Sequence, residues 1–325
     1  MAYAQTRSEL PVRAVPLSSG AVLYSVQIKV GATEIEAGLD TGSTGLRIFP
    51  GTLADGDATS GSPVAPYGFT SGNLYEGHAA TGTVTLGSIS GDAPMEVIDN
   101  ITCARNHSDC PIKHESPSDY GVRGNSLTGG RFRALFGINT VGATPKNPLV
   151  ALGVDSWIVE LPRADEPGRL ILNPSAEETK GFIRIPMIAA FHTMGPLGNS
   201  VTGCLVDALT KEKTCGPLVL DTGAPIIRLQ NSKVSPEILT AGRSVAFVLF
   251  DDRGPRAIEN IMLGQPQLGT RTTENIENRS TQTVIFSGTA PYQGLRVLYE
   301  PSQNQIGVEP RPAIAGVPMP EMVAR

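Results

Sequence analysis

Asp40-Thr41-Gly42-Ser43 and Asp221-Thr222-Gly223-Ala224 are two copies of one short motif in a chain of 325 residues. Each copy follows an apolar run, 37–39 or 218–220, and another apolar run begins a few residues later. Average residue usage gives one Asp-Thr-Gly in a chain of this length a chance of roughly 0.1, and two a chance of about 0.01. The repeat therefore predicts a duplicated fold whose halves meet at two carboxylates, those of Asp40 and Asp221.

The composition predicts an all-β protein of two domains. Charged residues make up 18% and hydrophobic residues 40%, with 36 glycines and 26 prolines. Short strands and turns are expected, because the chain has no long amphipathic helix pattern. The length suits two domains of ordinary size, each with its own core. We place the N-terminal domain at 1–165, with the first motif, and the C-terminal domain at 166–325, with the second.

Charge and hydropathy limit the partners. The net charge is −5, and no cluster of Lys and Arg could neutralise a row of phosphates, which argues against nucleic acid. No apolar run reaches the roughly 18 residues that a membrane helix needs. The segment 1–17 lacks the apolar centre of a signal peptide. We therefore expect that a signal peptide and a basic prosegment are absent from this chain.

Four cysteines fall into two local pairs, each spanning a short polar loop. Such pairs are typical of disulfide-closed hairpins and indicate an oxidising, extracytoplasmic compartment, either outside the cell or periplasmic. An alternative for the first pair is a zinc site with the spacing C-x3-H-x2-C-x3-H, formed by Cys103, His107, Cys110 and His114. The second, isolated pair favours disulfides, and the expected bonds are Cys103–Cys110 and Cys204–Cys215.

Local patterns predict the segments that carry the motifs. Strand 22–30, a turn at Gly31-Ala32 and strand 34–39 lead to Asp40. The apolar segments 134–138 and 261–264 carry a glycine near their ends, which suits passage close behind another backbone. Further expected features are a hairpin with a mobile tip at 67–87, a polar loop at 103–114, strands at 157–162, 169–172, 181–186, 295–299 and 305–308, a hinge near 173–186, an exposed loop at 270–283 and an extended or disordered tail after Pro310.

At these residues the chain resembles the two-lobed, pepsin-like aspartic proteases. LDTGSTGLRIFP (39–50) and LVLDTGAPIIRL (218–229) are similar to the two active-site loops of the family, and YGFTSGNLYEGHAATGTVTLG (67–87) to its flap hairpin. ALFGI (134–138) and IMLGQ (261–265) are similar to the segments that cross behind each aspartate, and 166–186 and 295–310 to the inter-lobe sheet. The resemblance, over about residues 20–310, implies a bilobal pepsin-like acid protease fold. In that fold two β-barrel-like lobes are related by a pseudo-two-fold axis, with a cleft between them.

The two carboxylates suit the hydrolysis of peptide bonds. Two carboxylates a few ångströms apart share one proton, because ionising both is costly. A water between Asp40 and Asp221 would lose a proton to the ionised carboxylate while it attacks the scissile carbonyl, and the protonated carboxyl would donate to the developing oxyanion. The sequence leaves open which aspartate holds the proton. The expected function is that of a monomeric aspartic endopeptidase without metal or cofactor, acting on a peptide or protein.

The other motif residues are expected to support the carboxylates. Ser43 can point its hydroxyl back at the first carboxylate. By resemblance, the hydroxyls of Thr41 and Thr222 link the two loops, while Gly42 and Gly223 let substrate backbone approach.

Two positions depart from the pattern of the family. The family usually places Ser or Thr after the second glycine, and its hydroxyl bonds the carboxylate, but Ala224 has no hydroxyl. A lost donor to the ionised form raises the proton affinity of the pair, so a pH optimum less acidic than that of pepsin is expected. Arg47 stands where many pepsins have a Trp that hydrogen-bonds the flap tyrosine. Either the flap contact is made differently, beside a pocket that prefers a polar or acidic residue, or Arg47 is a solvated strand residue.

Tyr67 is the expected flap tyrosine, with Gly68 offering backbone to substrate, and Tyr75 is the alternative. Two other functions remain open beside the protease. The first is a pepsin-fold binding or inhibitor protein with weak or no catalysis, although both aspartates are kept. The second is a glycosidase with two carboxylates, which nothing in the duplicated Thr-Gly context favours.

Overall fold

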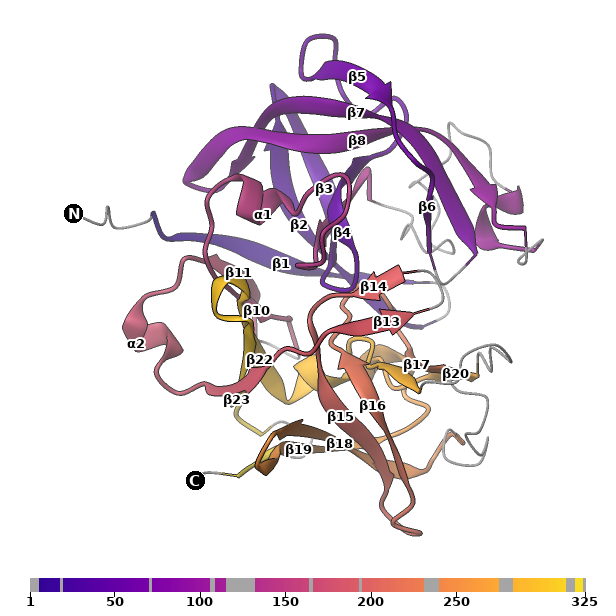
Figure 1. The fold of residues 1–325 in the computed structure, drawn as a ribbon, viewed down its shortest axis with the longest axis vertical. Coiled ribbons are helices and arrows are strands. Elements are labelled where there is room, and N and C mark those ends of the chain that lie inside the picture. The colour runs from indigo at the N-terminus through magenta and orange to yellow at the C-terminus, as the bar shows by residue number, and fades with distance from the viewer. Residues whose placement is uncertain are drawn as a thin grey trace.

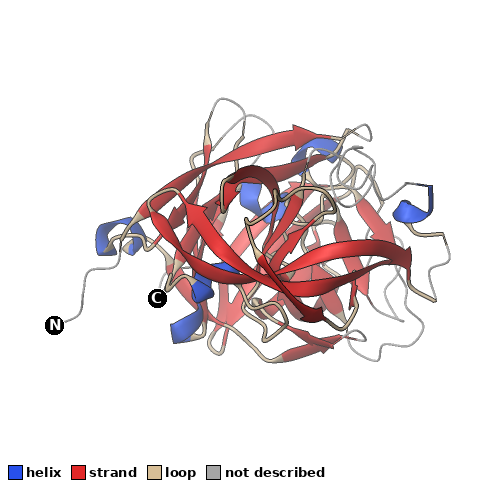
Figure 2. Ribbon diagram, turned by 90° about the horizontal axis from the view of Figure 1, so that it is seen from above, coloured by secondary structure: helices blue, strands red, loops and turns tan. Residues whose placement is uncertain are grey.

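The computed structural model describes residues 6–17, 20–69, 72–105, 109–114, 132–163, 166–192, 195–230, 240–274, 283–313 and 319–323. Most of these residues lie in β-strands, as the sequence predicted, and Figures 1 and 2 show how the strands wrap around one another. Helices are short in the described part of the chain, and their bounds are α1 Pro148–Ala151, α2 Ala176–Thr179, η1 Pro111–His114, η4 Pro266–Leu268, η5 Ala290–Gln293 and η6 Pro301–Gln303.

One sheet of 14 strands contains segments from both ends of the chain. Its order is β12-β23-β22-β10-β11-β1-β2-β3-β9-β4-β8-β7-β5, and β6 pairs with β7 beside this path. The bounds are β1 Ser8–Pro16, β2 Val22–Val30, β3 Thr33–Asp40, β4 Thr44–Ile48, β5 Thr59–Pro63, β6 Tyr67–Gly68, β7 Asn73–Leu86, β8 Ile89–Cys103, β9 Ala134–Ile138, β10 Trp157–Glu160, β11 Gly168–Leu172, β12 Ile183–Pro186, β22 Leu295–Glu300 and β23 Gln305–Pro310.

A second sheet has eight strands in the order β20-β17-β21-β16-β15-β18-β19-β24, and β13 and β14 form a separate pair. In Figure 1 strands β15 to β20 fill the lower part of the molecule, while β7 and β8 lie at the top. The bounds are β13 Ala190–His192, β14 Gly195–Leu197, β15 Ser200–Asp207, β16 Lys213–Val219, β17 Ile227–Gln230, β18 Ser244–Asp251, β19 Gly254–Met262, β20 Thr272–Glu274, β21 Val284–Phe286 and β24 Glu321–Met322.

Strands from the middle and the end of the chain join at one end of the large sheet. The segments 166–186 and 295–310 supply β11, β12, β22 and β23 to it. β10 connects them, because it pairs with both β11 and β22. Figure 1 shows these strands between the β7–β8 hairpin and the eight-stranded sheet.

The first predicted hairpin is confirmed. β2 and β3 pair from Ser25 opposite Gly38 to Val30 opposite Thr33. Val26, Ile28 and Ile35 of this hairpin belong to the main hydrophobic core. Burial on this face fixes the register of the two strands, and β3 therefore ends with Asp40 in a defined position.

The prediction for the segments behind the two motifs is right for the first and wrong for the second. β9 runs parallel to β3 and places Gly137 beside Asp40. The segment 261–264, however, continues β19, which pairs with β18 and β24. β21 takes the expected place instead, parallel to β16, and a Cβ on the following Gly288 would lie 2.3 Å from the carbonyl oxygen of Ile226. This half of the chain has two apolar runs near a glycine, 261–264 and 284–288. The later run is the one that pairs beside the second motif.

At the ends and loops the structure adds to the sequence analysis and corrects part of it. β1, which the sequence analysis missed, pairs with β2 and β11. The tail after Pro310 was expected to be extended or disordered, and its described part is extended at β24, which pairs with β19, and buried at Arg311, which is 1% exposed. The exposed loop expected at 270–283 begins with β20, which pairs with β17, while 275–282 lies outside the described residues.

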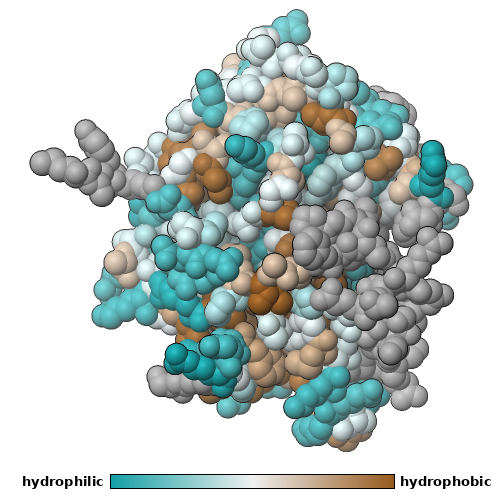
Figure 3. Space-filling view, in the orientation of Figure 1, coloured by the Kyte–Doolittle hydropathy of each residue, from teal (hydrophilic) through white to brown (hydrophobic). Residues whose placement is uncertain are grey.

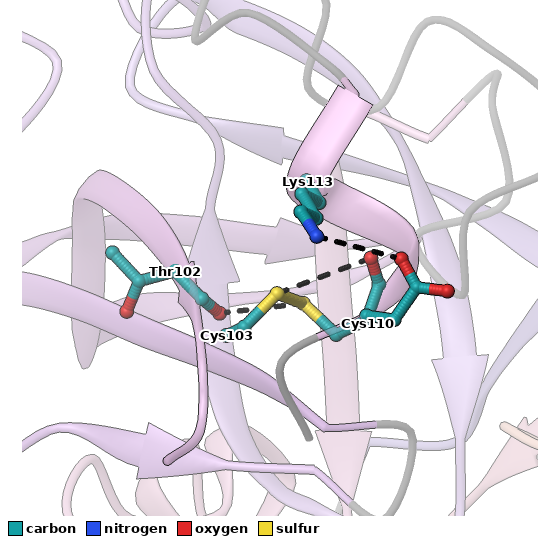
Figure 4. Close-up of a disulfide and its surroundings, with 5 residues drawn as sticks. Thr102, Cys103, Cys110 and Lys113 are labelled. Atoms are coloured by element: carbon teal, nitrogen blue, oxygen red, sulfur yellow. Dashed lines mark hydrogen bonds and ion pairs between the residues drawn. A yellow bond between two sulfur atoms is a disulfide. The ribbon is translucent and has the colours of Figure 1, made fainter. Parts of the chain in front are cut away.

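Both predicted disulfides are present. Cys204 and Cys215 lie opposite each other in the β15–β16 hairpin. Cys103, the last residue of β8, is bonded to Cys110 just before η1 (Figure 4). The zinc alternative is therefore wrong, since both thiolates that it needs are used, and the side chains of His107 and His114 lie outside the described residues.

Among the described residues, the exposed large hydrophobic side chains are single residues far apart in the sequence. The large hydrophobic side chains that are exposed come from four separate segments, and Figure 3 shows hydrophobic residues scattered among hydrophilic ones on one face. They are Val150, Leu209, Met262 and Met319. None of the described helices has the length and apolar character required to cross a lipid bilayer.

Candidate active site

The two Asp-Thr-Gly motifs occupy matching turns at the ends of strands. Asp40 ends β3, and β4 begins at Thr44. Asp221 follows β16 after one residue, and β17 begins at Ile227. Each turn is flanked by buried apolar strands, so the polar residues of the motifs have to find their hydrogen-bond partners in one another.

Four hydrogen bonds between Thr41 and Thr222 and their neighbours link the two turns. The backbone N–H of Thr41 donates to the hydroxyl of Thr222 at 3.0 Å, and the backbone N–H of Thr222 donates to the hydroxyl of Thr41 at 3.0 Å. The Thr41 hydroxyl donates to the Leu220 carbonyl at 2.7 Å, and the Thr222 hydroxyl to the Leu39 carbonyl at 2.8 Å. Both threonines are 0% exposed. The two turns thus make the same contacts with each other, although 181 residues separate them.

The glycines place the two carboxyl groups together. A Cβ added to Gly42 would lie 2.4 Å from a carboxyl oxygen of Asp221, and a Cβ added to Gly223 would lie 2.4 Å from the carboxyl group of Asp40. Because each glycine has no side chain, the carboxyl group of the aspartate in the other turn occupies the space where a Cβ would lie. The motif requires glycine at this position because a larger residue would displace the opposite carboxylate.

The two carboxylates receive unequal support. Asp40 accepts hydrogen bonds from the backbone N–H groups of Gly42 and Ser43, and from the Ser43 hydroxyl at 2.5 Å. Asp221 accepts a bond from the Gly223 N–H at 2.9 Å. Burial raises the pKa of Asp221, and the charge of Asp40 raises it further. With one backbone donor and a charged neighbour, Asp221 favours its protonated form.

Ala224 stands three residues after Asp221, as Ser43 stands after Asp40. Ala224→Thr should supply a hydroxyl to the Asp221 carboxylate, while Ser43→Ala should remove one from Asp40. Because a donor favours the ionised form, Ala224→Thr should lower the acidic limb of the pH profile of any reaction at the two carboxyl groups and Ser43→Ala should raise it, each by up to about one pH unit. A limb that stays in place in both folded variants would refute this role of the hydroxyls.

Tyr67 lies near enough to the two carboxyl groups for their charges to act on its phenol, whereas Tyr75 packs in a hydrophobic cluster. Burial raises the pKa of the Tyr67 phenol, and the negative charges of Asp40 and Asp221 contribute to the rise. Tyr75 is 2% exposed and packs against Phe49 in a separate hydrophobic cluster. Of the two candidates for the flap tyrosine, Tyr67 is therefore the one with a described interaction with Asp40 and Asp221.

The expected hairpin over 67–87 is correct only at its start. Tyr67 and Gly68 form β6, where they pair with Tyr75 and Leu74 of β7. β7 pairs over its whole length with β8 on its other edge, and further along it also pairs with β5. The backbone N–H of Phe69 closes the turn through the Asn73 carbonyl at 2.8 Å, and the tip at 70–71 lies outside the described residues.

Arg47 is a buried residue, so its interpretation as a solvated strand residue is wrong. It is 0% exposed and forms an ion pair with Glu96 at 2.9 Å. A second nitrogen of its guanidinium donates to the Thr44 carbonyl at 2.6 Å. The guanidinium carbon lies 3.7 Å from the centre of the Tyr67 ring. Arg47 therefore supports Tyr67 by stacking, a cation–π contact, and does not present its charge to solvent.

Removing Arg47 should be costly, because Glu96 would remain buried without a partner. We expect Arg47→Met to lower the free energy of unfolding at pH 7 by about 3–5 kcal/mol. The loss should be smaller at pH 4, since burial raises the pKa of Glu96 and its neutral form needs no counter-ion. The matched control is Arg7→Met, which removes a half-exposed pair with Glu178 and should cost less than about 1 kcal/mol. Equal losses in chemical unfolding would contradict this account.

Sequence reasoning missed three buried residues around the two motifs. Arg228 follows Asp221 by seven residues, as Arg47 follows Asp40. Arg228 is 7% exposed, and its charge opposes the rise in the pKa of Asp221. The shared offset is a signal that the sequence offered. Tyr292 and Tyr299, whose hydroxyls are 2.6 Å apart, gave no such signal.

No protein-family model matches the chain, and a comparison with curated proteins found no match. What we conclude about function therefore depends on the arrangement of the residues around Asp40 and Asp221.

Proposed function

We propose that this protein is an aspartic endopeptidase that hydrolyses peptide bonds with a water activated between Asp40 and Asp221. The observation that carries the proposal is the reciprocal contact of the two turns. Thr41 and Thr222 exchange hydrogen bonds, and each motif glycine lies against the aspartate of the other turn. Such an arrangement holds two carboxyl groups at one point.

Asp40 is the base in this proposal and Asp221 the acid. Ionised Asp40 takes a proton from the water as its oxygen attacks the scissile carbonyl, and Asp221 gives its proton to the carbonyl oxygen. A tetrahedral diol results. Asp40 then passes its proton to the leaving nitrogen, the C–N bond breaks, and Asp221 recovers a proton from the diol. Protons and electrons balance, and the dyad returns to its starting state.

Tyr67 would cover the substrate above the carboxyl groups. Its ring is supported by Arg47 at 3.7 Å, and a backbone hydrogen bond from Thr44 reaches its hydroxyl. With Tyr67 over the substrate, water would be excluded and the electrostatic interactions within the site would be stronger. Gly68, the other residue of β6, would offer its backbone to an extended peptide.

A pepsin-like arrangement of two lobes, divided near 165, fits the same observations. The first motif has β9 parallel to its leading strand and the second has β21, which suggests two related halves. Both aspartates belong to one chain, so the site needs no second copy. The two disulfides fit an oxidising, extracytoplasmic compartment.

The test is cleavage of a diverse peptide mixture between about pH 3 and pH 8, a span that brackets acidic and neutral operation of the dyad. Each reaction is run with and without a statine-type transition-state inhibitor, and Asp40→Asn is the control. We expect inhibitor-sensitive cleavage that the control lacks. A folded wild-type protein that cleaves nothing across this range would favour a binding or inhibitor protein instead.

A further inference from the structure

Two buried tyrosines extend the hydrogen bonds of the interlocked threonines. Tyr292 belongs to η5 and Tyr299 to β22, and both are 0% exposed. The hydroxyl of Tyr292 lies 3.1 Å from that of Thr41 and 2.6 Å from that of Tyr299. Behind the pair, Tyr299 stacks on Trp157 with their ring centres 5.8 Å apart. These two phenols are therefore fixed in direct contact with the first motif.

The number of protons sets the direction of this chain of hydroxyls. The Thr41 hydroxyl gives its only proton to the Leu220 carbonyl and accepts the N–H of Thr222. A hydroxyl has one proton and two lone pairs, so its last lone pair is left for the proton of Tyr292. The oxygen of Tyr292 then accepts from Tyr299. A longer contact, 3.4 Å, leads from the Tyr292 hydroxyl to the same carbonyl.

The hydrogen-bonded hydroxyls of Tyr299 and Tyr292 reach Thr41 of the first turn and not Thr222 of the second. The Thr222 hydroxyl donates to the Leu39 carbonyl and accepts the N–H of Thr41. Among the described residues it has no further partner comparable to Tyr292. The Leu220 carbonyl, where the chain ends, belongs to the peptide bond that leads into Asp221. The O–H dipoles of this hydroxyl chain therefore end next to Asp221, whose carboxylate has fewer hydrogen-bond donors than that of Asp40.

We propose that Tyr292 and Tyr299 are positioning residues for the two aspartates, a role that rests on the proposed protease function. They fix the Thr41 hydroxyl in the rotamer that bridges both turns, and they direct the positive ends of their O–H dipoles toward the dyad. Hydrogen bonds in such a chain polarise one another. The ionised dyad is thereby favoured. In the described part of the chain, the other charged groups that act on the Asp221 carboxyl are Asp40 and Arg228. The charges of Asp221 and Arg47 both act on the phenol of Tyr67.

The experiment compares Tyr292→Phe and Tyr299→Phe with the wild-type protein in the pH dependence of kcat/KM. Removing a dipole that favours the ionised dyad should move the acidic limb upward, by about half a pH unit for Tyr292→Phe and less for Tyr299→Phe. Tyr24→Phe is the matched control. Tyr24 is also buried, but its hydroxyl accepts a bond from Gln293 at 3.4 Å, and the groups that act on its phenol are Gln293 and Arg311, not the two aspartates. It should leave the limb in place.

A second measurement separates this inference from the proposed function. In full-length protein labelled with 13C at the aspartate carboxyl groups, NMR should show the dyad titrating at higher pH in Tyr292→Phe. If the wild-type protein cleaves peptides but both folded variants keep its pH profile, the tyrosine role fails and the protease stands. If no cleavage occurs, the protease fails, and the carboxyl titration still decides the role of the tyrosines. A uniform loss of kcat/KM without a shift would mean that the tyrosines are merely structural.

Discussion

Asp40→Asn and Asp221→Asn should each lower kcat/KM for peptide cleavage by at least about 1,000-fold, the size of effect expected when an acid–base group in the transition state is lost. An amide at position 40 cannot take the proton of the attacking water. An amide at 221 cannot deliver a proton to the carbonyl oxygen. The loss should persist at every pH, because neither amide titrates. A variant that keeps a tenth of the wild-type rate would contradict the roles assigned to the pair.

Stability provides the control for these variants. The pKa of Asp221 is raised in the folded protein. Between about pH 4, where an unfolded Asp loses its proton, and that raised pKa, the folded state keeps a proton that the unfolded state has released. The free energy of unfolding therefore falls as pH rises through this window. Asp221→Asn removes that dependence, so the variant should be more stable than the wild-type protein at pH 7 and similar to it below pH 4.

Gly42→Ala and Gly223→Ala should lower kcat/KM by about 100-fold or more, although neither changes a reacting group. The added Cβ would lie 2.4 Å from a carboxyl atom of the opposite aspartate, closer than real Cβ contacts allow. Relief requires a carboxyl group to move by about 1 Å, and a displacement of this size can cost 100-fold in rate.

The matched control for the glycines is Gly142→Ala. A Cβ on Gly142 would meet nothing within 4 Å, so this variant should keep the wild-type rate. Unfolding curves would show whether the motif variants are folded. If Gly42→Ala and Gly223→Ala are folded and as active as Gly142→Ala, the carboxyl groups are not held against these glycines in the working protein.

The sequence predicted those parts of the molecule that repeat or that stand close along the chain. The duplicated motif located both turns, and the short polar loops between cysteines indicated both disulfides. The β2–β3 hairpin was predicted because Val22–Val30 and a turn at Gly31 form a local unit. The two cysteines of each disulfide and the two strands of the hairpin are close in sequence, and the two turns have the same motif. None of these predictions required knowledge of which distant strands pair.

The features that were missed depend on pairing between distant segments. β21 and the segment 261–264 are both apolar and near a glycine, and only the sheet shows which one lies beside the second motif. β1 contains Pro11 and Pro16, which argue against a paired strand, yet burial of Leu10 and Val12 holds it in the large sheet.

Buried polar side chains were the hardest part of the site to predict. Along the sequence Arg47 could be either a flap contact or a solvated strand residue, and the choice is made only when Glu96, from a neighbouring strand, is placed opposite it. Tyr292 lies 251 residues from Thr41, and nothing along the chain connects the two. Such contacts become visible only when the tertiary fold brings their elements together.

If Asp40 and Asp221 act as proposed, a hydroxyl or a water fits between their carboxyl groups. The most direct measurement is the affinity, by calorimetry, of a statine-type inhibitor and of its analogue without the central hydroxyl. The wild-type protein should bind the hydroxyl compound at least about 100-fold more tightly, as expected for a transition-state analogue, and Asp40→Asn should lose this preference. Equal affinity of the wild-type protein for both compounds would contradict the claim.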